Sequence, residues 1–159
     1  MIVYHGTTEV IKNPDTSHSK KYLDFGKGFY VTTYEEQAKK WALRKAMRQQ
    51  RNAIVNVYDM KDNWKDYKVL SFEKENDRWL EFVCACRKGE PLNEEYDVVI
   101  GNVADDDVFK TVDMYFRGLW DKTKVQEELR YYKMNDQICI VNQQIIDEII
   151  TFVRYYEVD

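Results

Sequence analysis

The segment DFGKGFYVTT, residues 24–33, carries the clearest secondary-structure signals in the chain. Its second half is rich in aromatic and β-branched residues, which favour a strand over residues 28–33. Thr33 and Glu36 then have the spacing of a capping box, in which a hydroxyl and a carboxylate bind free backbone amides at the start of a helix. Apolar residues follow at helical spacing, which predicts one buried helix face formed by Ala38, Trp41, Ala42 and Ala46.

The residues before this segment predict a short strand followed by a long loop. Residues 2–5 are apolar or aromatic and lead into a turn at residues 6–8. Residues 9–28 are mostly polar and contain turn-forming residues around Pro14. A loop of this length inside a compact domain is unusual and is often functional.

The residues after the first helix alternate between strand and helix patterns without a regular order. We expect strands over residues 53–60, 96–101, 137–141 and 150–156. Amphipathic patterns predict helices around residues 79–86 and 108–119 and shorter ones over 122–132 and 143–149. This irregular mixture favours an α+β fold over a doubly wound α/β fold. The length of 159 residues fits a single domain that spans residues 1–159.

Composition and charge argue against several classes of protein. The chain has 24 Lys and Arg residues against 28 Asp and Glu residues, and the resulting charge of −4 argues against non-specific nucleic-acid binding. No apolar run is long enough to span a membrane, and the first residues have no secretory pattern. The three cysteines fit neither a disulfide framework nor a zinc motif, and no Rossmann or P-loop motif occurs. We therefore expect a cytoplasmic protein that binds no metal ion.

Three separated segments become informative when they are considered together: His5-Gly6-Thr7, Gly28-Phe29-Tyr30 and residues 137–140. They resemble the motifs of the ADP-ribosyltransferase superfamily, in the His-Tyr-Glu branch that includes poly(ADP-ribose) polymerases and diphtheria toxin. The sequence is most similar to an uncharacterised bacterial family of this group that shares the HGT and DFGxGFY motifs. The resemblance implies an ADP-ribosyltransferase-like split antiparallel β-sheet core with flanking helices, and NAD as the substrate.

The resemblance also implies roles for the residues of the first two motifs. His5 would hydrogen-bond the adenosine ribose of NAD. Gly6, followed by Thr7, would pair its backbone with the nicotinamide carboxamide, for which the absence of a Cβ allows close approach. Tyr30 and Trp41 would hold the cationic nicotinamide ring between aromatic faces. Taken singly, His5 is typical of a turn and the two aromatic residues of a core, but their combination favours an NAD site.

The third segment departs from the family pattern, in which a buried glutamate stabilises the ribosyl cation. Gln137 is expected at this position, because the apolar residues after it fit a buried strand. Its amide can accept a hydrogen bond but carries no charge, and the loss of one such contact lowers a rate by about 10²–10³. Asp136 points to the opposite face of the strand. It becomes the catalytic acid if the register shifts by one residue, and the alternative for both residues is an ordinary strand beginning.

The pyrophosphate of NAD calls for local positive charge in this acidic protein. Lys27 lies between the two best motifs and could approach the phosphates, as could His18, Lys20 and Lys21. The alternative is that this short charged run belongs to a solvated loop.

These residues lead to three hypotheses. The first is a toxin-like or regulatory mono-ADP-ribosyltransferase that acts on an unknown protein, nucleic acid or small molecule, under the control of a partner protein. The second is a module that binds NAD or ADP-ribose without turnover, and the third is an interaction domain whose aromatic residues form its core. Release of nicotinamide separates the first from the second, and stabilisation by ligand separates the second from the third.

Overall fold

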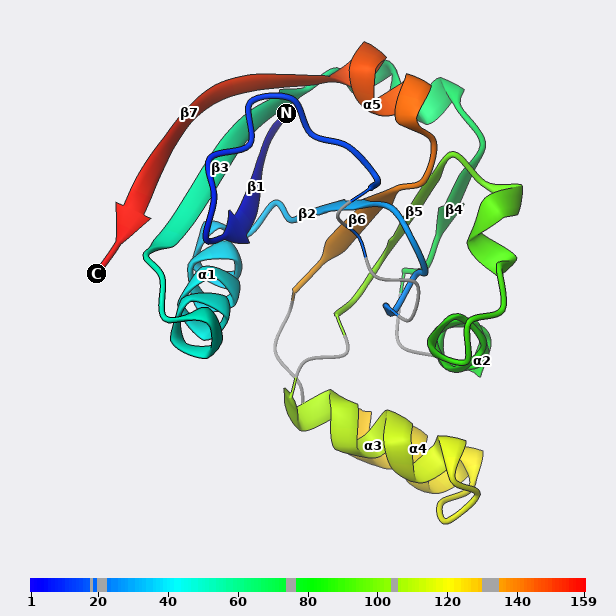
Figure 1. Ribbon diagram of the computed structural model, residues 1–159. Helices are drawn as coiled ribbons and strands as arrows, with labels where there is room; N and C mark the ends of the chain where they lie inside the picture. Colours follow the sequence, from blue (N-terminus) through cyan, green and yellow to red (C-terminus); the bar gives the residue numbers. More distant parts are fainter. Residues whose placement is uncertain (18, 20–22, 74–76, 104–105, 130–134) are drawn as a thin grey trace.

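The computed structural model describes residues 1–17, 19, 23–73, 77–103, 106–129 and 135–159 (Figure 1). Its strands are β1 (Ile2–Thr7), β2 (Phe29–Val31), β3 (Ala53–Met60), β4 (Val69–Ser71), β5 (Val98–Gly101), β6 (Gln137–Ile140) and β7 (Ile150–Val158). Its α-helices are α1 (Glu35–Gln49), α2 (Asp77–Arg87), α3 (Asp106–Phe116), α4 (Lys122–Leu129) and α5 (Gln143–Ile149). Two short 3₁₀ helices are η1 (Asp62–Asp66) and η2 (Leu92–Glu95). The fold is α+β, as the sequence predicts.

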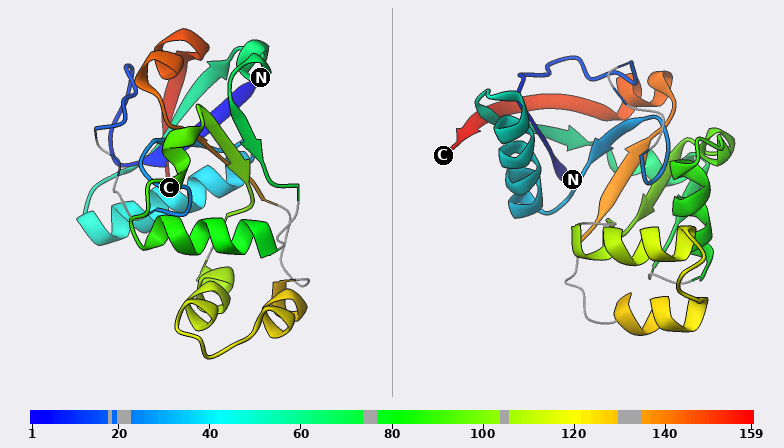
Figure 2. Two further views of the ribbon diagram at one scale, coloured as in Figure 1. Left: turned by 90° about the vertical axis from the view of Figure 1, so that its right-hand side faces the viewer. Right: turned by 60° about the horizontal axis from the view of Figure 1, so that its bottom comes forward.

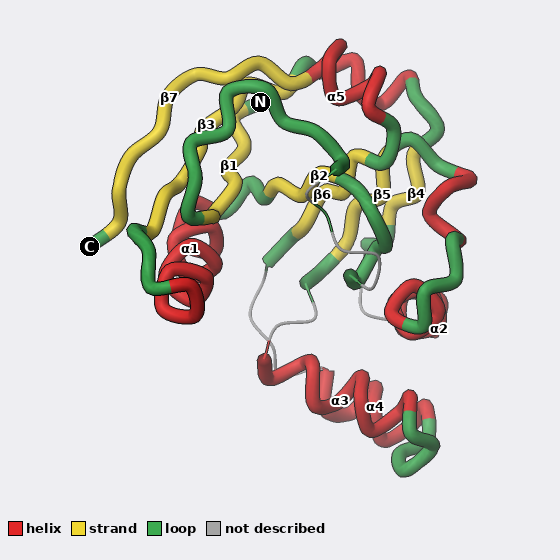
Figure 3. Tube along the Cα trace, viewed as in Figure 1, coloured by secondary structure: helices red, strands yellow, loops and turns green. Residues whose placement is uncertain are grey.

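The strands form two sheets, which Figure 3 shows in yellow. The first sheet has the order β1-β3-β7, and the second has the order β2-β6-β5-β4. Neighbouring strands are antiparallel except for β4 and β5, which are parallel. The second sheet is therefore mixed, whereas the resemblance implies an antiparallel core.

One pair of residues joins the two sheets. Tyr4 of β1 and Thr32, which follows β2, exchange two backbone hydrogen bonds of 2.8 and 2.9 Å. This bridge is isolated, so β1 and β2 pair at that point and then separate. Figure 1 shows the resulting split, with the first sheet on one side of it and the second sheet on the other.

The helices α1 and α2 lie on the same side of the two sheets (Figure 1). Tyr4 packs against a cluster that contains the alanines of α1, and Tyr30 packs against a cluster that contains most of α2. Because Tyr4 pairs with Thr32, and Tyr30 precedes Thr32 by one strand period, these side chains share one side. The opposite side holds a separate core that includes Val3, Phe29, Tyr58 and the apolar residues of α5.

The helices α3 and α4 pack side by side as a hairpin that extends away from the sheets (Figure 2). Val108, Val112 and Val125 of this hairpin are buried in the cluster of α2. The sequence places Phe116 and Leu119 on the same buried face, but they are 44% and 63% exposed. Leu119 is exposed because α3 ends at Phe116, so the helical periodicity does not continue to it.

The first predicted helix start is wrong in detail. The N-cap of α1 is Tyr34, whose side chain makes no capping hydrogen bond. Instead of reaching Glu36, the Thr33 hydroxyl donates a short hydrogen bond to Asp136. The three alanines of the predicted apolar face are buried, and Trp41 beside them is half-buried. Within the described residues, no helix combines the length and the apolar character that a membrane span requires.

Candidate functional site

The ladder between β1 and β2 stops after one rung. The backbone N–H and C=O of Tyr4 point toward Thr32 and away from β3. Since a strand repeats every two residues, the N–H and C=O of Gly6 point to the same edge. The next rung would join Gly6 to Tyr30, but among the described residues no backbone hydrogen bond joins them. The Gly6 peptide groups therefore face the split between the sheets.

His5 binds the Tyr30 carbonyl that the next rung would use. Its Nδ1 lies 2.6 Å from the backbone oxygen of Tyr30. Because a carbonyl only accepts, Nδ1 carries the hydrogen, which leaves Nε2 as the acceptor nitrogen. The imidazole stacks on Phe29, with a distance of 4.8 Å between the ring centroids. Burial lowers the pKa of His5 to about 4, so the imidazole is neutral at physiological pH.

Gly6 is fixed by the helix that packs on β1. A Cβ at this position would lie 1.9 Å from the backbone oxygen of Ala38 and 2.9 Å from the backbone nitrogen of Ala42. Only glycine allows such a close approach between a strand and a helix backbone. Gly6 therefore has a packing role in the contact between β1 and α1.

Tyr30 anchors the turn that precedes β2. Its hydroxyl donates a 2.5 Å hydrogen bond to the backbone oxygen of Gly26 and accepts one of 3.1 Å from the backbone nitrogen of Phe25. Burial raises the pKa of the Tyr30 hydroxyl well above its usual value, so the group stays protonated. The Tyr30 side chain thus fixes the path of the DFGKG loop against the second sheet.

Positive charge lies closer to β1 than the sequence indicates. Lys45 of α1 donates a 3.2 Å hydrogen bond from Nζ to the Thr7 hydroxyl at the end of β1. This lysine follows Trp41 by four residues, so both project from neighbouring turns of α1. Lys27 has an exposed side chain, and its backbone oxygen accepts a hydrogen bond from Asn93. The other candidates, His18, Lys20 and Lys21, lie outside the described residues.

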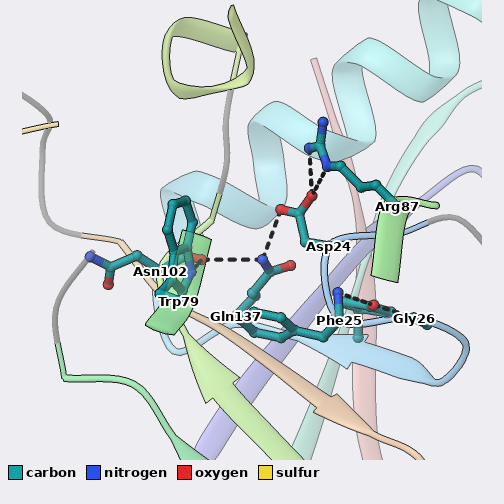
Figure 4. A network of polar contacts seen from close by, with 8 residues as sticks. Asp24, Phe25, Gly26, Trp79, Arg87, Asn102 and Gln137 are labelled. Carbon is teal, nitrogen blue, oxygen red and sulfur yellow. Dashed lines mark hydrogen bonds and ion pairs between the residues drawn. The ribbon is translucent and has the colours of Figure 1, made fainter. Parts of the chain in front are cut away.

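Gln137 begins β6 and is buried, with 4% of its surface exposed. Its side-chain Nε2 donates a 3.0 Å hydrogen bond to Asp24 Oδ2 and a second one, of 3.3 Å, to the backbone oxygen of Asn102 (Figure 4). The same carbonyl accepts a 3.1 Å hydrogen bond from the indole nitrogen of Trp79. Gln137 therefore joins the loop before β2, the end of β5 and α2.

The partner of Gln137, Asp24, belongs to a buried ion pair. Arg87, at the end of α2, donates to Asp24 Oδ1 from Nε at 2.8 Å and from Nη2 at 2.5 Å (Figure 4). The exposed fractions of the two side chains are 18% for Arg87 and 10% for Asp24. A charged pair in such surroundings depends on both partners, because removal of one leaves a buried charge uncompensated.

The orientation of the Gln137 amide is determined by its surroundings. Both groups beside Nε2 are acceptors only, a carboxylate and a carbonyl. The amide nitrogen must therefore face them, and the amide oxygen Oε1 must face away. A glutamate at position 137 would place its carboxylate, which only accepts, against the Asp24 carboxylate and the Asn102 carbonyl.

Asp136, the alternative catalytic residue, connects the start of β6 to the end of β2. Its Oδ1 accepts hydrogen bonds from the Thr32 hydroxyl at 2.6 Å and from the Thr33 backbone nitrogen at 2.9 Å. Its Oδ2 accepts the Thr33 hydroxyl, and its backbone oxygen accepts a 2.5 Å hydrogen bond from Gln37. These partners give Asp136 a structural role beside the bridge between the sheets.

The predicted site residues are only partly brought together. Gly6, Tyr30 and Gln137 lie on the side of the sheets that α1 and α2 cover, and Trp41 belongs to α1. The imidazole of His5 lies on the opposite side of β1, against Phe29. Among the described residues, no ring contact joins Tyr30 to Trp41. Within the residues that the structure describes, no group of three or more His, Cys, Asp or Glu side chains could hold a metal ion.

Two comparisons with known proteins define what this chain is related to. Residues 1–152 match the model of a family described as "Protein of unknown function (DUF3990)". The match covers most of the chain, so this protein belongs to that family. No curated protein matches the sequence.

Proposed function

We propose that this protein is an NAD-dependent mono-ADP-ribosyltransferase. The observation that carries the proposal is the interrupted ladder between β1 and β2, which turns the Gly6 peptide groups toward the split between the sheets. Gln137 lies across β2 from this edge, because β6 pairs with β2 in the register that places Val31 beside Ile138. The HGT, DFGKGFY and β6 segments, whose resemblance implies this activity, thus meet around the split.

The peptide of Gly6 fits a carboxamide. A strand residue whose N–H and C=O point to an edge without a neighbouring strand can pair them with the C=O and NH₂ of an amide, as in an antiparallel rung. In the proposed complex, Gly6 would bind the nicotinamide carboxamide in this way, and Trp41 and Tyr30 would present aromatic faces to the ring.

Two further groups suit the rest of the dinucleotide. His5 has its hydrogen on Nδ1, so Nε2 can accept a hydrogen bond from a ribose hydroxyl. Lys45, next to Thr7 at the end of β1, is a better candidate for the pyrophosphate than the exposed Lys27. His5 directly precedes Gly6 in β1, and Lys45 belongs to α1, the helix that packs against Gly6.

In the proposed reaction, the bond between the ribose C1′ and the nicotinamide nitrogen breaks, and its electron pair leaves with neutral nicotinamide. An acceptor nucleophile forms a bond to C1′ and releases one proton to water. Positive charge develops on the ribose as the bond breaks, and the Gln137 oxygen would stabilise it as a fixed dipole. A neutral amide stabilises this charge less than a carboxylate does, which favours slow transfer of a single unit.

The direct test is incubation of the protein with NAD and a cell lysate. We expect release of free nicotinamide and labelling of macromolecules when the label is in the adenine part of NAD. The Gln137→Ala variant should release nicotinamide about 10²-fold more slowly. Absence of nicotinamide release by the parent protein in every lysate contradicts the proposal.

A second function, binding of NAD or ADP-ribose without turnover, is favoured by one observation. The only buried carboxylate hydrogen-bonded to Gln137 among the described residues, Asp24, is neutralised by Arg87. A rise in melting temperature with NAD or ADP-ribose, without any release of nicotinamide, would identify this function, because a ligand of the native state stabilises it by mass action.

A further inference from the structure

A carboxylate does lie beside Gln137, the residue at the third motif position, but it belongs to a distant part of the chain. Asp24 is 113 residues away from Gln137 in sequence, and its Oδ2 lies 3.0 Å from the Gln137 amide nitrogen. It is contributed by the DFGKG loop, which Tyr30 holds in place through its hydroxyl. At the buried start of β6, the Gln137 amide is therefore in contact with the Asp24 carboxylate (Figure 4).

This arrangement explains why the residue at position 137 is glutamine. A glutamate there would place a second carboxylate against Asp24 and against the carbonyl of Asn102. Two adjacent carboxylates do not ionise together at neutral pH. Because Asp24 is present and paired with Arg87, an amide is the residue that satisfies both neighbours.

The hydrogen bond to Asp24 has a chemical consequence for the other end of the amide. A charge-assisted hydrogen bond from an N–H polarises the amide and increases the negative charge on its oxygen. The same bond prevents the side chain from rotating by half a turn, which would present NH₂ where an acceptor is needed.

We propose that Asp24 is a positioning residue that acts through Gln137. Asp24 orients and polarises the Gln137 amide, so that Oε1 accepts a ribose hydroxyl of NAD and faces the charge that develops on the ribose. Arg87 holds the Asp24 carboxylate in place with two hydrogen bonds. This inference rests on the proposed transferase function.

The experiment exchanges the two functional groups. Nicotinamide release and melting temperature are measured for Asp24→Asn, Gln137→Glu and the double variant, with Asp97→Asn as control. Asp97 directly precedes β5, and its carboxylate accepts a hydrogen bond from the Lys68 backbone nitrogen, at the end of β5 opposite to the residue that pairs with Gln137. Asp24→Asn should lower kcat on the order of tenfold and leave KM for NAD nearly unchanged, because the lost contribution acts mainly in the transition state.

Gln137→Glu alone should lower the melting temperature, and its activity should rise with falling pH as the carboxylate pair takes up a proton. In the double variant, the amide at position 24 can donate to the carboxylate at position 137. We expect this variant to regain stability and to release nicotinamide faster than Gln137→Glu, without its pH dependence.

The outcomes separate the two proposals. If the parent protein releases nicotinamide and Asp24→Asn does so at the rate of Asp97→Asn, the positioning role is wrong while the transferase function stands. The same conclusion follows if Gln137→Glu is as stable and as active as the double variant. If the parent protein releases no nicotinamide, both proposals fail.

Discussion

The two sides of the split are constructed in different ways. On the first sheet, small residues bring backbones together: β1 approaches α1 so closely that Gly6 has no room for a Cβ, and Ala38 and Ala42 complete the contact. On the second sheet, polar side chains from separate elements converge on the start of β6. The Asp24–Arg87 pair holds the Gln137 amide there, and Asp136 bonds to Thr32 and Thr33.

This difference determines what each side tolerates. The first side depends on volume, because backbone atoms of a helix cannot move apart without loss of packing along the whole contact. The second side depends on charge and hydrogen bonding, so that isosteric changes of polarity should have greater consequences there than changes of size. A substitution that adds one methyl group therefore tests the first side of the split, and one that removes a carboxylate tests the second side.

The largest effect is expected for Gly6→Ala. The added Cβ would overlap the Ala38 carbonyl and press on the Ala42 amide, so α1 must shift from β1. We expect a loss of about 3 kcal/mol or more in the free energy of unfolding, at the upper end of overpacking effects. Urea unfolding of both proteins measures this difference.

Gly118→Ala is the matched control. Gly118 has a φ of 73°, and a Cβ there would meet no atom within 4 Å. Gly118→Ala should lower the free energy of unfolding by only about 1 kcal/mol, the strain of an alanine in the left-handed conformation. Equal losses for the two variants would show that the tight contact of β1 and α1 does not limit stability.

The sequence predicts the elements of the fold better than it predicts their contacts. The strand over residues 53–60 and the helix over residues 143–149 have the predicted bounds, because local apolar patterns determine them. The strand β4 was not predicted, since three residues at a sheet edge give too short a pattern. The strand β2 ends at Val31, before the predicted end: Thr32 pairs with Tyr4 of the first sheet, and the Thr33 backbone nitrogen bonds to the Asp136 carboxylate.

In the candidate site, too, the sequence predicts individual residues better than the contacts between them. The motifs indicate Gly6, Tyr30 and Gln137, which the fold places on one side of the sheets. The sequence does not reveal that Asp24 contacts Gln137 or that Arg87 pairs with Asp24, because these contacts join residues 113 and 63 positions apart. No periodic pattern encodes such a contact. Lys45 has a weaker signal, which is its position one helical turn after Trp41.

Asp136→Ala should have the second largest effect. The variant loses the acceptor of three hydrogen bonds and leaves the buried hydroxyl of Thr32 without that partner. We expect a loss of about 2–3 kcal/mol in the free energy of unfolding, because bonds to a charged acceptor are stronger than neutral ones. Asp97→Ala, which removes a more exposed carboxylate, should cost about 1 kcal/mol or less.

The same variant addresses the register of the third motif. If Asp136 is structural, its removal should lower nicotinamide release per folded molecule much less than Gln137→Ala does. A loss of release in Asp136→Ala with unchanged stability would instead make Asp136 the catalytic acid and assign the structural role to Gln137.

The smallest effect concerns His5, which lies where β1 and β2 separate. Burial lowers the pKa of His5 from 6.5 to about 4, so between these values the unfolded chain binds a proton that the folded protein does not. The free energy of unfolding therefore rises with pH across this window, and this contribution is lost as pH falls toward 4. For a half-buried imidazole we expect about 1–2 kcal/mol over the window.

The variant that tests this is His5→Gln, whose amide can still donate a hydrogen bond to the Tyr30 carbonyl but does not titrate. Urea unfolding between pH 4 and 7.5 should give a flatter pH dependence for the variant than for the parent, since the carboxylates titrate alike in both. Parallel curves would mean that His5 is protonated as easily in the folded protein as in the unfolded chain. In that case the folded protein would not shield the imidazole from water.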